Sequence, residues 1–244
     1  MFTNLLRVDR FPTMWCPGCG LGTVMIQLAK VMDELGLDHT NSTIICGIGC
    51  TGRMAGYFQL DGVHTLHGRA LHVAEAVKMV NPDLNVIVVS GDGDLASIGG
   101  NHLVHSARRN ANLTVICNDN NIYGLTGGQA GPTTPKGTKT VTSPKGEDYE
   151  PINLQSLVMA SAKYFYAKTT TFHQAHLHKC MREAISWPGF AFVDIASQCI
   201  ENNGRRLGFN SAWEMLQHYR KTYKRAPEDA EKLGPGETGI VRRG

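Results

Sequence analysis

Four apolar runs, separated by helical stretches, are the feature that most limits how this chain can fold. The runs span residues 43–50, 85–94, 112–120 and 190–197 and are rich in Val and Ile. Such near-continuous apolar runs are typical of parallel strands that are buried on both faces. Strands that alternate with helices form βαβ units with right-handed crossovers. The sequence therefore predicts an α/β fold with a doubly wound, mostly parallel sheet.

Six amphipathic stretches between and after these runs are predicted to be helices. They cover residues 23–36, 70–80, 99–111, 154–164, 173–186 and 211–223. The first should end at Gly36, because glycine is a common helix stop. Residues 126–152 do not fit this rhythm, since they are rich in Gly, Pro, Thr and Ser. A loop of this length in a compact domain is usually functional or disordered.

Composition excludes several classes of protein. The 244 residues carry a net charge of only +3, which is too little to indicate nucleic-acid binding. There is no run of 18 apolar residues, and the first ten residues lack the apolar region of a signal peptide. We therefore expect a cytoplasmic chain with no membrane partner. In that reducing compartment the seven cysteines should be thiols or metal ligands rather than disulfides.

The cysteines differ in their sequence context. Cys16 and Cys19 lie in "TMWCPGCG", with two residues between them. The pair alone fits a redox dithiol, half of a zinc site, or two of the four ligands of an iron–sulfur cluster. Cys46, Cys117 and Cys180 lie within predicted strands and a helix, where a free cysteine acts as a small apolar residue.

A turn of alternating Gly and Asp, residues 91–94, ends one of the predicted strands. Ligands of open α/β sheets bind beyond the carboxyl ends of the strands, and glycines there let the backbone approach a phosphate. Asp92 and Asp94 would repel a phosphate unless a divalent cation bridged the two. Asn120 follows the next strand and adds an amide oxygen. This donor set suits Mg²⁺.

The Gly-Asp-Gly turn followed by an Asn-rich turn resembles the signature of thiamine diphosphate enzymes. The motifs "WCPGCG", "GIGC", "HGRA", "GDGDLASIGGNH", "ARRN" and "IYGLTGGQAGPTTP" extend the likeness. Over about residues 12–205, the chain resembles the β subunit of 2-oxoacid:ferredoxin oxidoreductases. The resemblance implies a thiamine diphosphate-binding domain over residues 1–205, with an N-terminal loop for an iron–sulfur cluster. Residues 206–244 are expected to form a C-terminal helix and a tail.

The resemblance also implies roles for individual residues. Mg²⁺ would be bound by Asp92, Asn120 and the backbone carbonyl of Ile122. A [4Fe–4S] cluster would be held by Cys16, Cys19, Cys50 and Cys199. Thiamine diphosphate would be contacted by Ile48, Gly49, Cys50, Thr51, His67, Gly68, Arg69, Gly93, Asp94, Gly124 and Leu125.

The implied activity is reversible oxidative decarboxylation of a 2-oxoacid, with coenzyme A as cosubstrate. Electrons would pass through the cluster to ferredoxin or a ferredoxin-like subunit. A partner α subunit would supply the pyrimidine domain, so that this chain alone is inactive. His67 is the expected acid–base residue. Arg53, just after "GIGC", is suited to bind a second carboxylate with two parallel hydrogen bonds. This favours conversion of 2-oxoglutarate to succinyl-CoA and CO₂.

Other readings stay open at this point. Pyruvate and branched-chain 2-oxoacids are alternative substrates. A non-redox thiamine diphosphate decarboxylase subunit would share the Gly-Asp-Gly and Asn pattern but would not need four cysteines. A zinc-bound interaction protein would usually carry two CxxC pairs at short separation, whereas Cys50 and Cys199 lie far apart.

Overall fold

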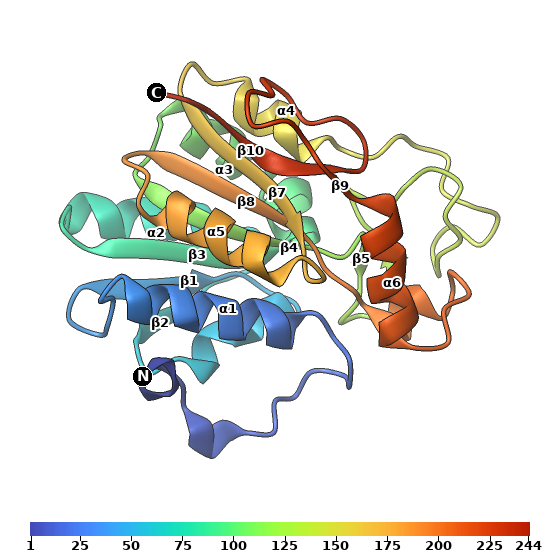
Figure 1. The fold of residues 1–244 in the computed structure, drawn as a ribbon, viewed down its shortest axis with the longest axis horizontal. Coiled ribbons are helices and arrows are strands. Elements are labelled where there is room, and N and C mark those ends of the chain that lie inside the picture. Colours follow the sequence, from blue (N-terminus) through green and yellow to red (C-terminus); the bar gives the residue numbers. More distant parts are fainter.

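An eight-stranded sheet runs through the computed structural model, which describes residues 1–244 (Figure 1). The strand order is β2-β1-β3-β4-β8-β7-β10-β9, and every pairing is parallel except that of β10 with β7. The strands are β1 (Ser42–Cys46), β2 (Asp61–His64), β3 (Asn85–Gly91), β4 (Leu113–Asp119), β7 (Tyr164–Thr170), β8 (Phe190–Ala196), β9 (Lys224–Arg225) and β10 (Glu237–Arg243). Strands β5 (Ile122–Tyr123) and β6 (Gln129–Ala130) form a separate hairpin. The predicted α/β class and mostly parallel sheet are confirmed.

Helices cover both faces of the sheet. Helices α1 (Leu21–Glu34) and α5 (Gln174–Ile185) pack side by side on one face (Figure 1). The other face carries α2 (Ala70–Val80), α3 (Gly100–Arg108) and α4 (Leu154–Met159). Helix α6 (Ala212–Thr222) stands beside the sheet and is followed directly by β9 (Figure 1). Short helical turns complete the chain: η1 (Phe2–Leu5), η2 (Val8–Arg10), η3 (Thr51–Tyr57), η4 (Asp94–Ile98) and η5 (Ile200–Gly204).

Two hydrophobic clusters, one on each face, explain the apolar runs. In β8, Ala191, Val193 and Ile195 pack into the cluster beneath α1 and α5. The alternating residues Phe190 and Phe192 pack into the cluster beneath α2, α3 and α4. Each large apolar side chain buried in this way contributes about 1.5–3 kcal/mol. Because successive strand residues point to opposite faces, a strand covered on both faces is apolar at nearly every position, and Asp194 is the one charged residue of β8.

Helix ends follow local sequence signals. Gly36 has a φ of +65°, a conformation that glycine adopts readily, and it stops α1 as predicted. Ser211 begins α6, and its side chain accepts a hydrogen bond of 3.2 Å from the backbone N–H of Glu214. The Glu214 carboxylate in turn accepts a 2.8 Å hydrogen bond from the backbone N–H of Asn210. This is close to the reciprocal capping pattern of a helix start.

Several predicted boundaries were wrong. The helix predicted over 154–164 ends at Met159, and Tyr164 instead begins β7. The runs 43–50 and 85–94 leave the sheet at Cys46 and Gly91. The tail was not expected to contain a strand, yet β10 pairs with β7 inside the central sheet. Strand β2 was missed because its four residues are all exposed and carry no apolar pattern.

The segment 126–152 is an ordered loop that lies beside the end of β4. It is held by its own backbone, since the N–H of Val141 donates to the carbonyl of Gly128 at 2.9 Å and that of Gly137 to Glu147 at 2.7 Å. Thr133 and Thr140 are buried within it. No helix of the structure is both long enough and apolar enough to span a membrane.

Candidate active site

The motifs singled out in the sequence meet at one edge of the sheet. Parallel strands place their carboxyl ends at the same edge, so the turns after β1, β2, β3, β4 and β8 become neighbours. These turns carry the predicted site residues Ile48, Gly49, Cys50 and Thr51, then His67, Gly68 and Arg69, then Asp92, Gly93 and Asp94, then Asn120, Ile122, Gly124 and Leu125, and finally Cys199. The strand order thus brings together residues as far apart in the chain as Ile48 and Cys199.

Asp92 is a buried carboxylate with an unusual pKa. Its side chain is only 2% exposed, and Oδ2 accepts a 2.6 Å hydrogen bond from the Thr133 hydroxyl. Burial raises the pKa of Asp92 to about 6, against the opposing effect of that hydrogen bond. The same hydroxyl lies 2.9 Å from Asp119, whose pKa burial and the Asp194 charge raise well above its usual value. A bound cation would stabilise the charged form of a carboxylate that is buried away from solvent in this way.

Asn120 and Ile122 stand beside this carboxylate. The Asn120 side-chain oxygen accepts a 3.2 Å hydrogen bond from the N–H of Ile122, which closes a tight turn. Gly131, from the segment 126–152, approaches closely enough that a Cβ there would lie 3.6 Å from Asp92 Oδ2. The donors are therefore an anionic carboxylate, an amide oxygen and a backbone carbonyl, and all three are hard oxygen ligands that fit Mg²⁺.

Asp94 was predicted to contact thiamine diphosphate, but in the structure its side chain is hydrogen-bonded to other groups of the protein. Its Oδ1 accepts hydrogen bonds from the N–H groups of Ile48 (3.0 Å) and Gly68 (2.8 Å) and lies 2.5 Å from Nδ1 of His67. Its Oδ2 accepts a 2.6 Å hydrogen bond from Ser90. The carboxylate therefore joins the turns after β1, β2 and β3. A contact between Asp94 and the diphosphate therefore stays a prediction, and it would involve the main chain of Asp94.

Two glycines allow this arrangement. A Cβ on Gly47 would lie 1.8 Å from Asp94 Oδ2, so only glycine fits at that place. Gly68 has a φ of +70°, and a Cβ there would lie 2.6 Å from the Ile98 side chain. Gly47 was missed by sequence reasoning, because a close approach between distant segments leaves no local pattern.

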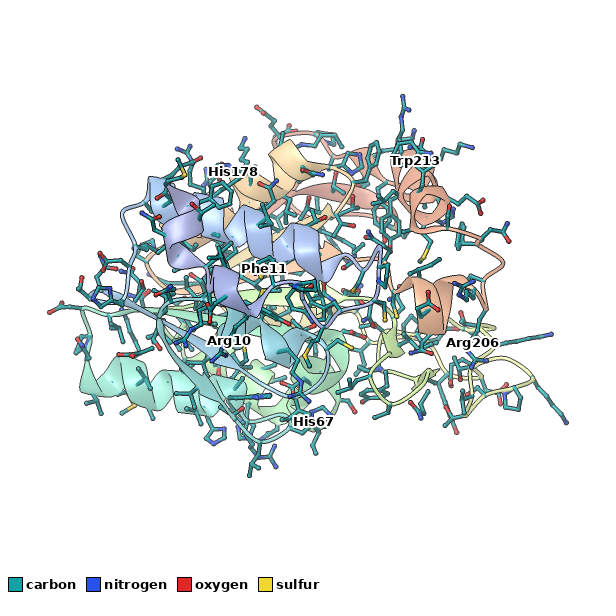
Figure 2. All side chains as sticks on the ribbon, turned by 90° about the horizontal axis from the view of Figure 1, so that it is seen from below. Arg10, Phe11, His67, His178, Arg206 and Trp213 are labelled. Carbon is teal, nitrogen blue, oxygen red and sulfur yellow. The ribbon has the colours of Figure 1, made fainter.

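His67 and Arg69 differ in how they are held. One ring nitrogen of His67 is hydrogen-bonded to Asp94. The His67 side chain is 40% exposed and lies in the lower part of the molecule in Figure 2. Its ring stands edge-to-face with Tyr123 at 6.5 Å. Arg69 instead donates to the carbonyls of Gly68 and Ile98, at 3.2 and 3.4 Å. His67 therefore presents a free ring nitrogen at the site, whereas Nη1 of Arg69 is held by two backbone carbonyls.

Four cysteines gather from three separate segments. Burial, together with the charges of the neighbouring Cys199, Cys50 and Cys16 thiols, raises the pKa of Cys19 to about 12. Those four groups therefore lie within electrostatic reach of one another. Burial also raises the pKa values of Cys50 and Cys199, and neighbouring thiols of the same set add to both shifts. A set of thiols that repel one another as anions would be stabilised by bound cationic iron.

Hydrogen bonds tie the cysteine-bearing loops together. The indole N–H of Trp15 donates to the carbonyl of Cys50 at 2.8 Å. Gln198, next to Cys199, donates from its side chain to Gly18 at 3.1 Å, and its carbonyl accepts from the N–H of Gly20 at 3.0 Å. The loop carrying Cys16 and Cys19 is thus fixed to both other segments.

The arrangement of the thiols is not that of a closed single-metal site. No three Cys, His, Asp or Glu side chains are grouped as the ligands of one metal ion. A structural Zn²⁺ would need four donors at about 2.0–2.3 Å from the ion. A cluster is larger than one ion, and its ligands stand farther apart. Cys46, Cys117 and Cys180 are fully buried in the core, as predicted for small apolar residues, and Cys180 Sγ also lies 3.2 Å from Nε2 of His176.

Apolar side chains surround the mouth of the site. Ile48 is 37% exposed, Leu125 is 51%, Ile98 is 52% and Leu66 is 79%. Leu66 and Ile98 were not singled out in the sequence. Gly93, predicted to line the diphosphate, packs directly beneath the ring of Tyr123, which a Cβ would approach to 2.3 Å.

Arg53 lies apart from the Asp94 network. It belongs to η3, is exposed, and has no ion-pair partner and no side-chain hydrogen bond. It lines a cavity next to the cofactor turn, together with Arg7 and Arg10. Its guanidinium is therefore free to bind an anion.

Fold and site together define a thiamine diphosphate-dependent class of protein. Residues 47–195 match the family described as thiamine pyrophosphate enzyme, C-terminal TPP binding domain. This matched range includes the turns after β1, β2, β3 and β4.

Similar proteins narrow the class. The 2-oxoglutarate synthase subunit KorB of Methanothermobacter marburgensis is 41% identical over 97% of this chain and 86% of its own length. The β subunit of 2-oxoacid:ferredoxin oxidoreductase 2 of Aeropyrum pernix is 40% identical over 91% of this chain and 73% of its own length. A solved 2-oxoglutarate:ferredoxin oxidoreductase from Magnetococcus marinus, with 2-oxoglutarate, coenzyme A and succinyl-CoA bound, has a TM-score of 0.87 and 34% identity over 98% of this chain and 84% of that one. The chain belongs to the family of β subunits of 2-oxoacid:ferredoxin oxidoreductases.

Proposed function

We propose that this chain is the β subunit of an enzyme that converts 2-oxoglutarate and coenzyme A to succinyl-CoA and CO₂, reversibly, and passes the electrons to ferredoxin. The observation that carries the proposal is the meeting of two sets of residues at one sheet edge. One is the buried Asp92 with Asn120 and Ile122, and the other is the group of four cysteines. This neighbourhood supports the proposal of a cofactor site for decarboxylation beside a site suited to single electrons.

Asp92, Asn120 and the carbonyl of Ile122 would hold Mg²⁺ at the diphosphate. The hydrogen bond from Thr133 fixes the Asp92 carboxylate, so that a metal meets a preformed ligand. The backbone of Gly93 and Asp94 and the residues Gly124 and Leu125 would line the diphosphate. When bound, thiamine diphosphate supplies the carbanion chemistry of decarboxylation, while the protein positions it and controls its surroundings.

Cys16, Cys19, Cys50 and Cys199 would hold a [4Fe–4S] cluster, which accepts and donates single electrons. Cys50 supports this role, because it directly follows Ile48 and Gly49, the residues proposed to contact the thiamine cofactor. A cluster held there would lie next to the source of electrons. Cys16 is exposed, so the outer edge of the same site would face an electron carrier such as ferredoxin.

Arg53 and His67 would act on the substrate. The free guanidinium of Arg53 would bind the distal carboxylate of 2-oxoglutarate through two parallel hydrogen bonds. Asp94 fixes the tautomer and orientation of His67 by accepting at Nδ1, which leaves the other nitrogen to take up or release a proton.

The α subunit is proposed to bind over the cofactor site. The exposed apolar residues Ile48, Leu66, Ile98 and Leu125 would be unfavourable in water as a group. A pyrimidine domain seated on them would bury them, exclude water and supply the Glu that activates the cofactor. The isolated chain is then inactive, although it carries the diphosphate and cluster residues.

The test is an anaerobic activity assay of the complex co-purified with its α subunit. With ferredoxin as acceptor, 2-oxoglutarate should be oxidised faster than pyruvate or branched-chain 2-oxoacids, and only with coenzyme A present. A colourless complex that decarboxylates 2-oxoacids without any electron acceptor would instead be a non-redox decarboxylase. Equal rates with pyruvate and 2-oxoglutarate would overturn the assigned substrate.

A further inference from the structure

A cavity of about 460 Å³ opens between the N-terminal segment and η3, next to the cofactor turn. Its most notable side chains are basic: Arg7, Arg10, Arg53 and His64. Among all eleven lining residues there is no aspartate and no glutamate. Arg10 and its neighbour Phe11 are labelled in Figure 2.

The arginines of this cavity are held in place but not neutralised. Arg7 donates from Nε to the carbonyl of Phe58 at 2.9 Å, and Arg10 donates from Nη1 to the carbonyl of Gly56 at 2.9 Å. None of the three arginines has an ion-pair partner. Each guanidinium carries five N–H donors, so most donors remain free. Fixed cations without counter-charges in a hollow attract anions.

The wall of the cavity is preorganised. Tyr57 is buried, and its ring packs against those of Trp15 at 5.0 Å and Phe11 at 6.0 Å. Its hydroxyl accepts a 2.8 Å hydrogen bond from the N–H of Met14. The cavity volume falls within the range of about 300–1,000 Å³ typical of sites for ligands of drug size. A single carboxylate would fill little of it, so the ligand should be larger and carry several negative charges.

The cavity lies next to the turn proposed to contact the cofactor, because its lining residues Gly52 and Arg53 directly follow Cys50 and Thr51 in the chain. The proposed reaction needs one large, strongly anionic cosubstrate. Coenzyme A carries three phosphate groups at its nucleotide end, and a long flexible arm separates them from the thiol. We infer that this cavity binds the phosphate groups of coenzyme A, with Arg7 and Arg10 as their main ligands. This inference rests on the proposed function.

The test uses the complete complex with Arg7→Gln or Arg10→Gln. Each variant should raise the KM for coenzyme A about tenfold, the usual effect of losing one charged hydrogen bond, and leave the KM for 2-oxoglutarate unchanged. Arg108→Gln, on the exposed side of α3, is the matched control and should change neither constant. An unchanged KM for coenzyme A in both variants would overturn the inference.

Binding measurements separate this inference from the proposed reaction. Titration calorimetry with coenzyme A, and competition by adenosine 3′,5′-bisphosphate, need no turnover. The dissociation constant of both probes should rise in Arg10→Gln even if the complex oxidises no 2-oxoacid. Equal affinities in wild type and variant would exclude the site.

A chemical measurement on the wild-type complex covers the case in which the variants do not assemble. Coenzyme A should slow the modification of Arg7 and Arg10 by phenylglyoxal, as read from peptide masses, while Arg108 reacts as before. Unchanged modification of Arg7 and Arg10 would contradict the inference.

Discussion

Asp94 and His67 lie 27 residues apart in the chain, and their side chains meet at 2.5 Å, carboxylate Oδ1 to imidazole Nδ1. The same oxygen accepts from the backbone N–H groups of Ile48 and Gly68. One buried carboxylate therefore sets the positions of three turns that would surround the cofactor. It also gives His67 a fixed orientation.

Asp94→Asn should disrupt all three turns at once. An amide group cannot accept three hydrogen bonds at one oxygen and also accept from Ser90 with its NH₂ group. We expect a loss of about 2–4 kcal/mol in the free energy of unfolding, together with weaker thiamine diphosphate binding. Denaturant unfolding and cofactor titration measure these effects. His67→Gln is the control, since it removes only one of the four contacts and should cost much less stability.

Replacing Cys16 or Cys19 with serine should remove the cluster and abolish ferredoxin reduction. Binding of Mg²⁺ and thiamine diphosphate should survive at least in part, because Asp92 and Asn120 lie on other loops. Iron and sulfide analysis and cofactor binding are the measurements. Cys180→Ala is the matched control, since this thiol is buried in the core and should leave the iron content unchanged. Full iron content in Cys16→Ser would contradict the assigned cluster.

Asp92 should make stability depend on pH in the metal-free protein. Because its folded pKa is raised to about 6 from 3.8, the folded state holds the proton more tightly than the unfolded state. This stabilising contribution is fully present below pH 3.8 and is lost as the pH rises through about 6, with a size on the order of 3 kcal/mol. Asp92→Asn should therefore be more stable than wild type above pH 6 without metal. Thermal unfolding of both proteins measures this.

Magnesium should make the wild type more stable than Asp92→Asn, the reverse of the order expected without metal. Mg²⁺ with thiamine diphosphate should raise the Tm of the wild type, because the charged carboxylate gains a cation. The same addition should leave the Tm of Asp92→Asn nearly unchanged. An equal rise in both proteins would show that Asp92 is not the metal ligand.

Arg53→Ala should affect a dicarboxylate more than a monocarboxylate. Loss of a charge-assisted pair should raise the KM for 2-oxoglutarate about 10–100-fold and change the KM for pyruvate much less. Steady-state kinetics of the complex at saturating coenzyme A measure both constants. Parallel increases for the two substrates would refute the role of Arg53 in selecting a second carboxylate.

The sequence predicted those parts of the fold in which burial leaves a clear pattern. Strands β1, β3, β4 and β8 are apolar at nearly every position because helices cover both of their faces. Strand β7 was missed because it contains Lys168, whose charge is tolerated only through its 2.9 Å pair with Asp194 in β8. Strand β10 is charged and lies toward the sheet edge, so its sequence looks like a tail.

The site, like the fold, was predicted from the sequence only where its residues leave a local pattern. Residues in turns directly after strands, such as Asp92 and Asn120, could be placed together because parallel strands share an edge. Thr133 and Gly47 could not, because their roles come from contacts with carboxylates on distant segments. Asp94 was recognised, but the number of donors around its carboxylate is a property of the folded chain alone.

The most direct test of the central proposal is the optical and electron paramagnetic spectrum of the anaerobic complex before and after 2-oxoglutarate is added. We predict a brown protein whose visible absorption bleaches on addition of 2-oxoglutarate, with the signal of a reduced [4Fe–4S] cluster appearing at the same time. Cys199→Ser should show neither change. A complex without iron, or one whose cluster stays oxidised while 2-oxoglutarate is consumed, would contradict the proposed function.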